Sequence, residues 1–368
     1  MKVAIFCPYD FSFPGGVQTQ SIDLAESLSL KGHDVTVIAP LSSKNIHNNN
    51  QIKFLDLGIP LQINFLGSKS RISINFFKIL KIINYIKKNN FEIIHLNEPL
   101  SPTFLPIIFF LRKFSIIGTF HAYGDKKHFW YSNFKWFLKF FLNKINIKIC
   151  VSKSSQKYIN NYFDFSSQII PNGILLSKYN KTKIIPKELR NSDKKILFVG
   201  RFEEKRKGFN ILLEAFDKLS GEIKNLQLVV IGSGDPKKIK KDILSKNIHF
   251  IGHVEQNDLN AFYNNVDIIC LPSLENESFG VIILEAMASG KILALSNIIS
   301  YEALSKKNNY GFLYNSNSSE ELYKLLLDLL NNNIPTEINI KNGLKNVQNY
   351  SWDYLVSEII KIYRQLKN

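Results

Sequence analysis

Short apolar segments alternate with longer amphipathic segments along this chain of 368 residues, and the alternation runs through twice. The first series of apolar segments comprises residues 3–7, 34–39, 93–96, 116–120 and 148–151. The second series comprises residues 195–199, 226–231, 248–251, 268–271 and 292–294. Strands that alternate with helices indicate parallel βαβ units. The sequence therefore predicts the α/β class, with a parallel sheet in each of two domains.

A turn-rich segment, residues 166–194, separates the two series. It contains Pro171-Asn172-Gly173 and Pro186, and these residue types are typical of turns and linkers. We therefore expect a first domain over residues 1–170 and a second over residues 171–350. Residues 351–368 have helical periodicity, with an apolar face that can pack back on the first domain.

The three cysteines lie in separate apolar segments without metal-ligand spacing, which predicts buried thiols in a reducing compartment. Met1-Lys2 leads directly into a strand that lacks a signal-peptide cleavage site. The apolar run over residues 104–111 is far shorter than the roughly 20 residues of a membrane-spanning helix. We therefore expect a cytoplasmic protein.

The net charge of +16 fits polyanionic partners: nucleic acid, anionic lipid or phosphorylated substrates. A general bias toward Lys, Asn and Ile would raise the charge as well, without any binding role. The chain has no recognisable nucleic-acid-binding motif, so we expect no nucleic-acid partner.

Two glycines follow the first apolar segment, within Pro14-Gly15-Gly16-Val17-Gln18, before a helical pattern that starts near Thr19. Glycine lets the backbone approach a ligand closely, and a helix N-terminus favours an anion. The segment therefore predicts a phosphate cradle, although a plain turn has the same pattern. It is neither a Gly-x-Gly-x-x-Gly motif nor a Walker loop.

The second series begins with a strand that is followed by Arg201 and Lys207. Arg can bind a diphosphate through two hydrogen bonds, and Lys contributes a point charge. Cations at the carboxyl end of a parallel strand therefore predict a diphosphate site. The alternative is a solvated basic loop.

The segment from Glu277 to Gly290 is largely apolar apart from its two glutamates. Its residues Ser278, Phe279 and Gly280 are expected to open a helix with free N–H groups. Glu277 and Glu285 are eight residues apart, about two helical turns, which places them near one face. Such a pair can accept hydrogen bonds from sugar hydroxyls. Solvated surface glutamates are the alternative.

His121 ends the strand over residues 116–120, at the carboxyl edge where parallel sheets bind ligands. A histidine there can equally be an ordinary core or loop residue.

Two segments have the residue pattern of a membrane-binding surface. A helix over residues 76–88 would place Lys78, Lys81 and Lys88 on one face. The opposite face would carry Phe76, Ile79, Leu80, Ile83 and Ile86. Residues 126–141 mix lysines with aromatic residues, as is typical of a headgroup interface. Alternatively, both helices bury their apolar faces in the first domain and leave the lysines solvated.

Together these motifs resemble the retaining GT-B glycosyltransferases that carry a Glu-X7-Glu motif. The resemblance covers nearly the whole chain and is strongest to the bacterial phosphatidylinositol α-mannosyltransferases. The segments that carry it are Pro8-Tyr9, Pro14-Gly15-Gly16-Val17-Gln18, Asn97-Glu98-Pro99, Thr119-Phe120-His121, Pro171-Asn172-Gly173, Gly200-Arg201-Phe202-Glu203-Glu204 and Arg206-Lys207-Gly208.

The resemblance implies two Rossmann-like domains whose parallel sheets face each other across a cleft. It also implies transfer of a hexosyl group with retained configuration, namely mannose from GDP-mannose to a membrane lipid such as phosphatidylinositol. The nucleotide sugar would be a substrate, and neither a cofactor nor a metal ion would be required. The enzyme would be peripheral at the inner face of the cell membrane, bound to anionic phospholipid.

The resemblance also assigns roles to individual residues. The implied donor-binding residues are Gly16, Arg201, Lys207, Val254, Glu277, Ser278, Phe279, Gly280 and Glu285. The implied catalytic residues are His121, Arg201, Lys207 and Glu277. The implied acceptor-binding residues are Tyr9, Gln18, Ser68 and Arg71.

Two departures from the family pattern lie on the acceptor side. The family's Pro-Tyr-Asn-Gly-Ser stretch is replaced at residues 63–68, and Ala122 replaces a threonine. One alternative is therefore a hexosyltransferase of the same fold that uses UDP-glucose or another nucleotide sugar on a glycolipid or a soluble sugar. Another is a non-enzymatic nucleotide- or lipid-binding module, which would be expected to lose the charged residues that are present here.

Overall fold

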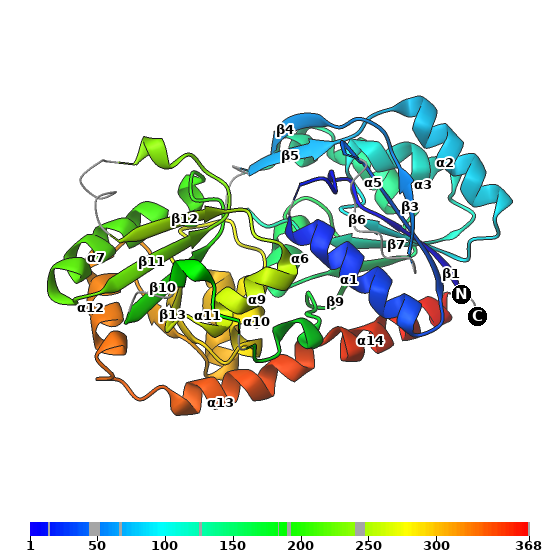
Figure 1. Ribbon diagram of the computed structural model, residues 1–368. Coiled ribbons are helices and arrows are strands. Elements are labelled where there is room, and N and C mark those ends of the chain that lie inside the picture. The colour runs from blue at the N-terminus through cyan, green and yellow to red at the C-terminus, as the bar shows by residue number, and fades with distance from the viewer. Residues whose placement is uncertain are drawn as a thin grey trace. The chain divides into compact units, whose positions relative to one another are not determined.

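The computed structural model of the chain divides into two compact units (Figure 1). Unit 1 comprises Met1–Gly173 and Tyr350–Asn368, and unit 2 comprises Ile174–Asn349. The structure describes residues 1–13, 15–43, 52–65, 68–124, 127–182, 184–189, 193–239 and 247–366.

Unit 1 is built on a seven-stranded parallel sheet with the order β3-β2-β1-β6-β7-β8-β9. Its central strands β1, β6 and β7 are buried along almost their whole length because helices cover both faces of a parallel sheet. The strands are β1 Lys2–Phe6, β2 Asp34–Ala39, β3 Lys53–Asp56, β6 Ile93–Asn97, β7 Ser115–Phe120, β8 Ile147–Cys150 and β9 Gln168–Ile169. A separate antiparallel pair is formed by β4 Leu61–Phe65 and β5 Ser68–Ile72.

The helices of unit 1 follow the strands, and the last helix comes from the C-terminal end of the chain. They are α1 Gly16–Leu30, α2 Phe76–Lys88, η1 Pro102–Phe104, α3 Leu105–Phe110, α4 Phe129–Asn133, α5 Lys135–Leu142, α6 Lys153–Asn160 and α14 Trp352–Gln365. Helix α14 packs against α1 (Figure 1). The residues after 350 therefore belong to the first unit.

Unit 2 has a six-stranded parallel sheet with the order β12-β11-β10-β13-β14-β15. Its strands are β10 Lys194–Val199, β11 Leu226–Ile231, β12 Ile248–Gly252, β13 Ile268–Leu271, β14 Ile292–Ser296 and β15 Phe312–Tyr314. The α-helices are α7 Phe209–Glu222, α9 Gln256–Asn264, α10 Val281–Ala288, α11 Ile299–Asn308, α12 Ser319–Leu330 and α13 Glu337–Asn346. The short helices are η2 Leu176–Tyr179, η3 Lys187–Leu189, η4 Lys205–Lys207, η5 Pro236–Lys238 and η6 Val347–Tyr350.

These two parallel sheets confirm the predicted α/β class. All ten predicted strands are present, with bounds that differ by at most a few residues. The cysteines are buried and free. Within the described part of the chain, no helix is both long enough and apolar enough to cross a membrane.

Candidate functional site

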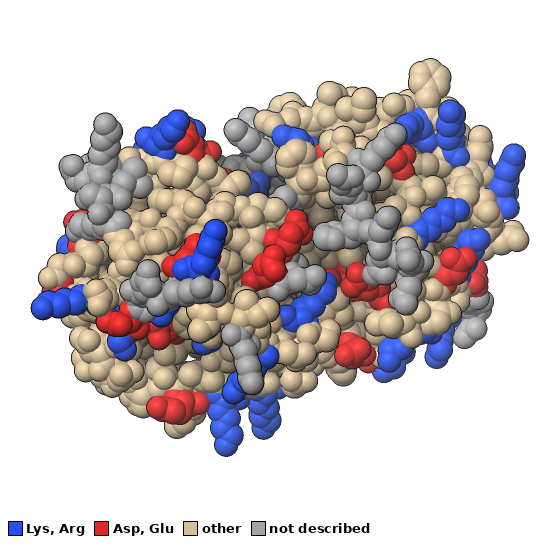
Figure 2. All heavy atoms as spheres, in the orientation of Figure 1, with Lys and Arg blue, Asp and Glu red and all other residues tan. Residues whose placement is uncertain are grey.

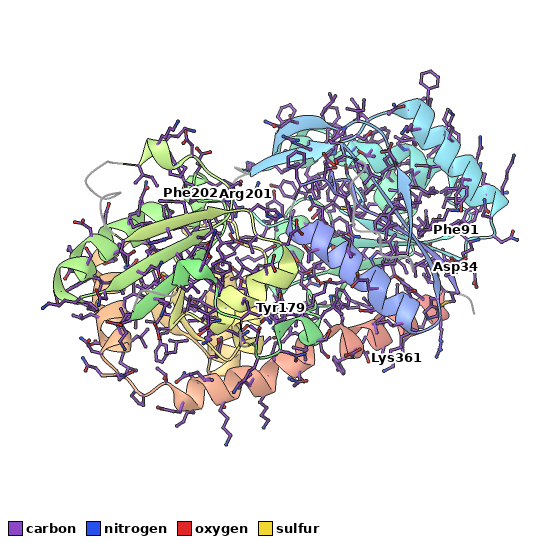
Figure 3. The ribbon with its side chains drawn as sticks, in the orientation of Figure 1. Asp34, Phe91, Tyr179, Arg201, Phe202 and Lys361 are labelled. Carbon is purple, nitrogen blue, oxygen red and sulfur yellow. The ribbon has the colours of Figure 1, made fainter. Side chains whose placement is uncertain are left out.

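Unit 2 gathers five charged side chains just past the carboxyl ends of β10 and β13. Arg201 pairs with Glu204 at 2.8 Å, and Glu204 pairs with Arg206 at 2.7 Å. Glu277 accepts from Arg206 at 2.8 Å and from Lys207 at 2.5 Å. Figure 3 shows Arg201 where β10 ends. We call these five residues the charge network. It carries three cations and two carboxylates, so one positive charge is in excess.

Burial and pairing act in opposite directions on the pKa values of the charge network. Burial alone would raise the pKa of Glu277, but Lys207 and Arg206 outweigh it and hold the pKa below its usual value. Burial would lower the pKa of Arg206, but the two carboxylates raise it. Arg201 has a lowered pKa because burial outweighs its attraction to Glu204. The lowered pKa of Glu277 and the raised pKa of Arg206 both favour the ionised forms of this pair near neutral pH.

Gly208 explains why the charge network can assemble. Its φ of +64° lies in the left-handed region, and a Cβ on this residue would lie 1.8 Å from the carbonyl oxygen of Pro272. Only glycine lets the backbone after η4 approach the segment after β13 so closely. The Leu274 N–H then donates to the Arg206 carbonyl at 2.7 Å. This contact brings the cations of η4 to Glu277.

The segment of the predicted carboxylate pair differs from our expectation. Helix α10 begins at Val281, with Gly280 as its N-cap at a φ of +92°. Glu277 therefore lies before the helix, and the two glutamates do not share a helical face. The prediction of one face was wrong because Gly280 adopts a left-handed conformation that interrupts the helical pattern.

Glu285 is buried on α10 and has a partner that sequence analysis did not identify. Tyr263 of α9 donates its hydroxyl to Glu285 Oε2 at 2.5 Å. The Tyr263 ring in turn lies 6.2 Å from that of Tyr179 in η2, which Figure 3 labels. These contacts fix the orientation of the carboxylate.

The other predicted donor residues of unit 2 lie on loops at the same sheet edge. Val254 is half-buried after β12, and Ser278 is half-buried before α10. Phe279 is buried, so its side chain is part of the packing there. Their donor-binding roles stay predictions.

In unit 1, two consecutive residues at the end of β6 hold His121 at the end of β7. Asn97 Oδ1 accepts from His121 Nε2 at 2.8 Å, and Glu98 Oε1 accepts from the His121 backbone N–H at 2.7 Å. Asn97 Nδ2 donates to the Phe6 carbonyl at 3.2 Å. A carbonyl can only accept, so Asn97 Oδ1 must face His121, and the imidazole carries its proton on Nε2.

Burial shifts the pKa values of the titratable groups around His121 in the direction that favours their neutral forms. Burial lowers the pKa of His121 to about 3 and that of His95 to about 4. Burial raises the pKa of Glu98 to about 7. A cavity of about 30 Å³ adjoins His121 and is also lined by His95 and Asn172. His121 is therefore an uncharged hydrogen-bonding group near neutral pH.

The glycine pair begins helix α1, with Gly15 as its N-cap. A Cβ on Gly16 would meet no atom within 4 Å, so the backbone there is open to approach. Gln20, one turn further on, clamps Gly173, accepting from its N–H and donating to its carbonyl, both at 2.8 Å. Pro14 lies outside the described residues.

Three of the four predicted acceptor residues surround one loop after β1. Tyr9 pairs with Ile72 of β5, and the Arg71 guanidinium lies 3.5 Å from the centre of the Phe13 ring. Gln18 donates to the carbonyl oxygens of Asp10 and Phe13, at 3.3 Å each. Ser68 begins β5, and its side chain lies outside the described residues.

The basic helix over Phe76–Lys88 is present as α2. It buries Ile79, Ile82, Ile83 and Ile86. Phe76, predicted on the same apolar face, is 52% exposed. Lys78 pairs with Asp56, whereas Lys81 and Lys88 are exposed.

Sequence analysis missed Arg206 and Glu204 as members of the charge network. It quoted Asn97-Glu98 as part of a motif without giving either residue a role. The signal for Arg206 was its position beside Lys207, and the signal for Asn97 and Glu98 was their position at a strand end. Tyr263 left no signal, because its contact with Glu285 joins two helices. Among the described residues, no cluster of three or more His, Cys, Asp or Glu is placed to hold a metal ion.

Two family models together match nearly the whole chain. The model "Glycosyltransferase Family 4" matches residues 14–178, and "Glycosyl transferases group 1" matches residues 180–346. The chain is a family 4, group 1 glycosyltransferase. A similar curated protein is the phosphatidyl-myo-inositol mannosyltransferase of Mycobacterium leprae, which is 28% identical over 365 residues. That match covers 99% of this glycosyltransferase and 96% of the relative.

Solved structures show that this glycosyltransferase has the GT-B fold. Sucrose-phosphate synthase from Thermosynechococcus elongatus superposes with a TM-score of 0.75 at 20% identity, covering 99% of this chain and 98% of that one. Anabaena HepE in complex with UDP-glucose superposes with a TM-score of 0.74 at 17% identity, covering 99% and 100% of the two chains.

Proposed function

We propose that this glycosyltransferase transfers a hexosyl group from a nucleotide diphosphate to a lipid hydroxyl, with retained anomeric configuration. The observation that carries the proposal is the charge network, because its excess positive charge suits a diphosphate. The resemblance to Glu-X7-Glu enzymes supports the retained configuration.

The charge network would act most strongly as the bond to the diphosphate breaks. Negative charge then develops on the leaving group, and Arg201 and Lys207 are the cations proposed to stabilise it. Such stabilisation is often the largest single contribution to catalysis. Gly16 is proposed as a further donor-binding residue, and Glu285 would accept from the nucleotide ribose.

His121, which is neutral, is proposed to contact the transferred sugar, and Glu277, as a carboxylate, is proposed to accept from its hydroxyls. A neutral imidazole offers one donor and one acceptor, which matches the bonding capacity of sugar hydroxyls. Tyr9, Gln18, Ser68 and Arg71 are proposed to line the acceptor site.

We propose GDP-mannose as donor and phosphatidylinositol as acceptor, because the phosphatidyl-myo-inositol mannosyltransferases match this chain over almost its full length. UDP-glucose is the second candidate, supported by the HepE complex. The chain departs from the family pattern at residues 63–68 and at Ala122, on the acceptor side. A different glycolipid or a soluble sugar therefore stays an alternative acceptor.

A surface of unit 1 supports a lipid acceptor. Helix α3 packs between two others, since it contacts both α2 and α5. Their exposed aromatic residues are Phe76, Phe77, Phe109, Phe110, Trp136, Phe137 and Phe140. Their exposed basic neighbours are Lys81, Lys87, Lys88, Arg112, Lys113, Lys135, Lys139 and Lys144. We call this surface the basic aromatic face, and Figure 2 shows Lys and Arg along its α2 edge.

Both the aromatic and the basic side chains of the basic aromatic face suit binding to an anionic membrane. Exposed aromatic groups of this density mark interaction surfaces, with Phe77 79% and Trp136 88% exposed. Each lysine near an anionic surface contributes about 1 kcal/mol of attraction. Several together can hold the enzyme reversibly at a lipid substrate.

The donor and the acceptor are tested together by a product panel. The purified protein is incubated with GDP-mannose, UDP-glucose and other nucleotide sugars, each with vesicles of different lipids, and products are identified by mass. We expect mannosylated phosphatidylinositol. Glucosylated lipid would replace the proposed donor, and a chain that glycosylates nothing in the panel would contradict the proposal.

Membrane binding is tested by co-sedimentation with vesicles. We expect binding to anionic vesicles, weakened by salt, and no binding to neutral ones. Changing Lys78, Lys81 and Lys88 together to Ser should weaken binding, with Lys81 and Lys88 contributing most because Lys78 already pairs with Asp56. A matched control changes Lys324 and Lys341 of unit 2 to Ser. Equal binding to both vesicle types would contradict the electrostatic account.

A further inference from the structure

Glu98 has a backbone conformation that is unusual for its residue type. Six described residues other than glycine have positive φ, and five of them are asparagines, which tolerate the left-handed region. Glu98, at a φ of +55°, is the sixth. A strained residue of this kind persists only where the surrounding structure holds it, and such residues concentrate at functional sites.

The contacts of Glu98 explain what holds it. Its N–H donates to the Thr119 carbonyl at 2.8 Å, and the Ser101 N–H donates to the Glu98 carbonyl at 3.0 Å. These bonds fix the turn between β6 and the next helix. The left-handed turn directs the carboxylate across to the neighbouring strand, where it accepts the N–H groups of His121 and Ala122.

The other carboxylate oxygen, Glu98 Oε2, is buried and has no hydrogen-bond partner among the described residues. Among the described residues, no cation is a cause of the pKa shift of Glu98. The groups whose pKa values its charge raises include Cys7, Tyr9, Tyr131, Cys150 and Tyr158. Burial raises the pKa of each of them, so they are neutral near pH 7. A carboxylate in such a place is costly, and packing alone does not require it.

We propose that Asn97 and Glu98 are positioning residues that act as a two-point clamp on His121. Asn97 holds the imidazole through Nε2, and Glu98 holds the backbone from which the imidazole projects. The strained turn sets both contacts at once, because the two residues are consecutive. The clamp presents His121 as a neutral group in one tautomer and one orientation.

The clamp is sensitive to pH in one direction. A charge-assisted hydrogen bond is stronger than a neutral one, so the carboxylate holds the His121 N–H more tightly than the protonated carboxyl does. The pKa of Glu98 is raised to about 7, chiefly by burial and against the two backbone donors. Turnover should therefore rise as pH increases through about 7. His121 and His95 cannot cause this rise, because their pKa values are lowered to about 3 and 4.

The inference rests on the proposed transfer reaction, so its first test does not use turnover. The amide signal of His121 is followed by NMR as a function of pH in the ligand-free protein. We expect it to titrate with a midpoint near 7 in the wild type and to stop titrating there in Glu98→Gln. The matched control is Glu92→Gln, because Glu92 precedes β6 at its other end and accepts the Lys2 N–H at 2.9 Å. A His121 titration that persists unchanged in Glu98→Gln would overturn the clamp.

The second test separates positioning from stability. Asparagine suits the left-handed region but is too short to reach His121, so Glu98→Asn should keep or raise the Tm. Its kcat for mannose transfer from GDP-mannose to phosphatidylinositol vesicles should fall about tenfold to a hundredfold, as for other small misplacements. Wild-type kcat in Glu98→Asn would overturn the proposal, and so would a fall in kcat matched by a fall in Tm. If the wild type does not use GDP-mannose, the proposed donor is wrong. The NMR titration of the His121 amide then tests the proposed clamp by itself.

Discussion

The two units hold their candidate functional residues by different electrostatics. In unit 2, Arg201 and Lys207 sit in a network where every carboxylate has a cation within 2.8 Å. In unit 1, His121 is held by an amide and a buried carboxyl, and its pKa is lowered to about 3. Unit 2 pairs its charged groups with opposite charges, whereas unit 1 keeps His121 neutral. The difference suggests that one unit is adapted to a charged ligand and the other to hydroxyl groups.

The largest effect is expected from removing a cation of unit 2. Lys207→Ala should lose about 2–4 kcal/mol of transition-state stabilisation, as is typical when a single leaving-group or oxyanion contact is removed. This loss corresponds to a fall in kcat/KM of roughly 30-fold to 900-fold. Lys205→Ala is the matched control, because Lys205 lies on the same short helix but is exposed. Steady-state kinetics with both variants decides the point. Near-native turnover in Lys207→Ala would remove Lys207 from the site.

A smaller effect is expected at Glu285, which is fixed by Tyr263. Glu285→Gln keeps the size of the side chain but removes its charge, so the free energy of donor binding should weaken by about 1.5–3 kcal/mol, a loss of affinity of roughly 13-fold to 160-fold. Calorimetric titration of the nucleotide sugar measures this loss. Unchanged donor affinity would refute the proposed contact with the ribose.

No effect is expected from chelation, because the groups proposed to stabilise the leaving diphosphate are protein cations and helix N-termini. Turnover in excess EDTA should match turnover in untreated enzyme. Complete loss of turnover that returns on adding a divalent ion would contradict the proposal that protein groups alone stabilise the leaving diphosphate.

The fold was largely predictable because its strands are apolar and separated by amphipathic helices. The strands that sequence analysis missed are short or polar: β3, β9, β15 and the β4–β5 pair. They lie at sheet edges or outside the main sheets, where burial does not impose an apolar pattern. The hairpin matters for the candidate site, because β5 carries Arg71 to the loop after β1.

The candidate site was predictable in its residue types and less so in its contacts. Arg201, Lys207 and His121 could be named because each follows a strand at the carboxyl edge of a sheet. The pairing of Lys207 with Glu277 joins residues 70 positions apart and depends on the close approach at Gly208, which no local pattern encodes. The strain at Glu98 likewise appears only in the backbone angles.

The comparison between the units is tested most directly by titrating GDP and UDP into three proteins: the wild type, Lys207→Ala and His121→Ala. We predict that Lys207→Ala binds the preferred nucleotide at least about tenfold more weakly, since it loses a charge-assisted contact. His121→Ala should bind that nucleotide like the wild type yet lose turnover with the corresponding nucleotide sugar. Equal weakening in both variants, or unchanged binding in Lys207→Ala, would contradict the assignment of the diphosphate to the charge network of unit 2.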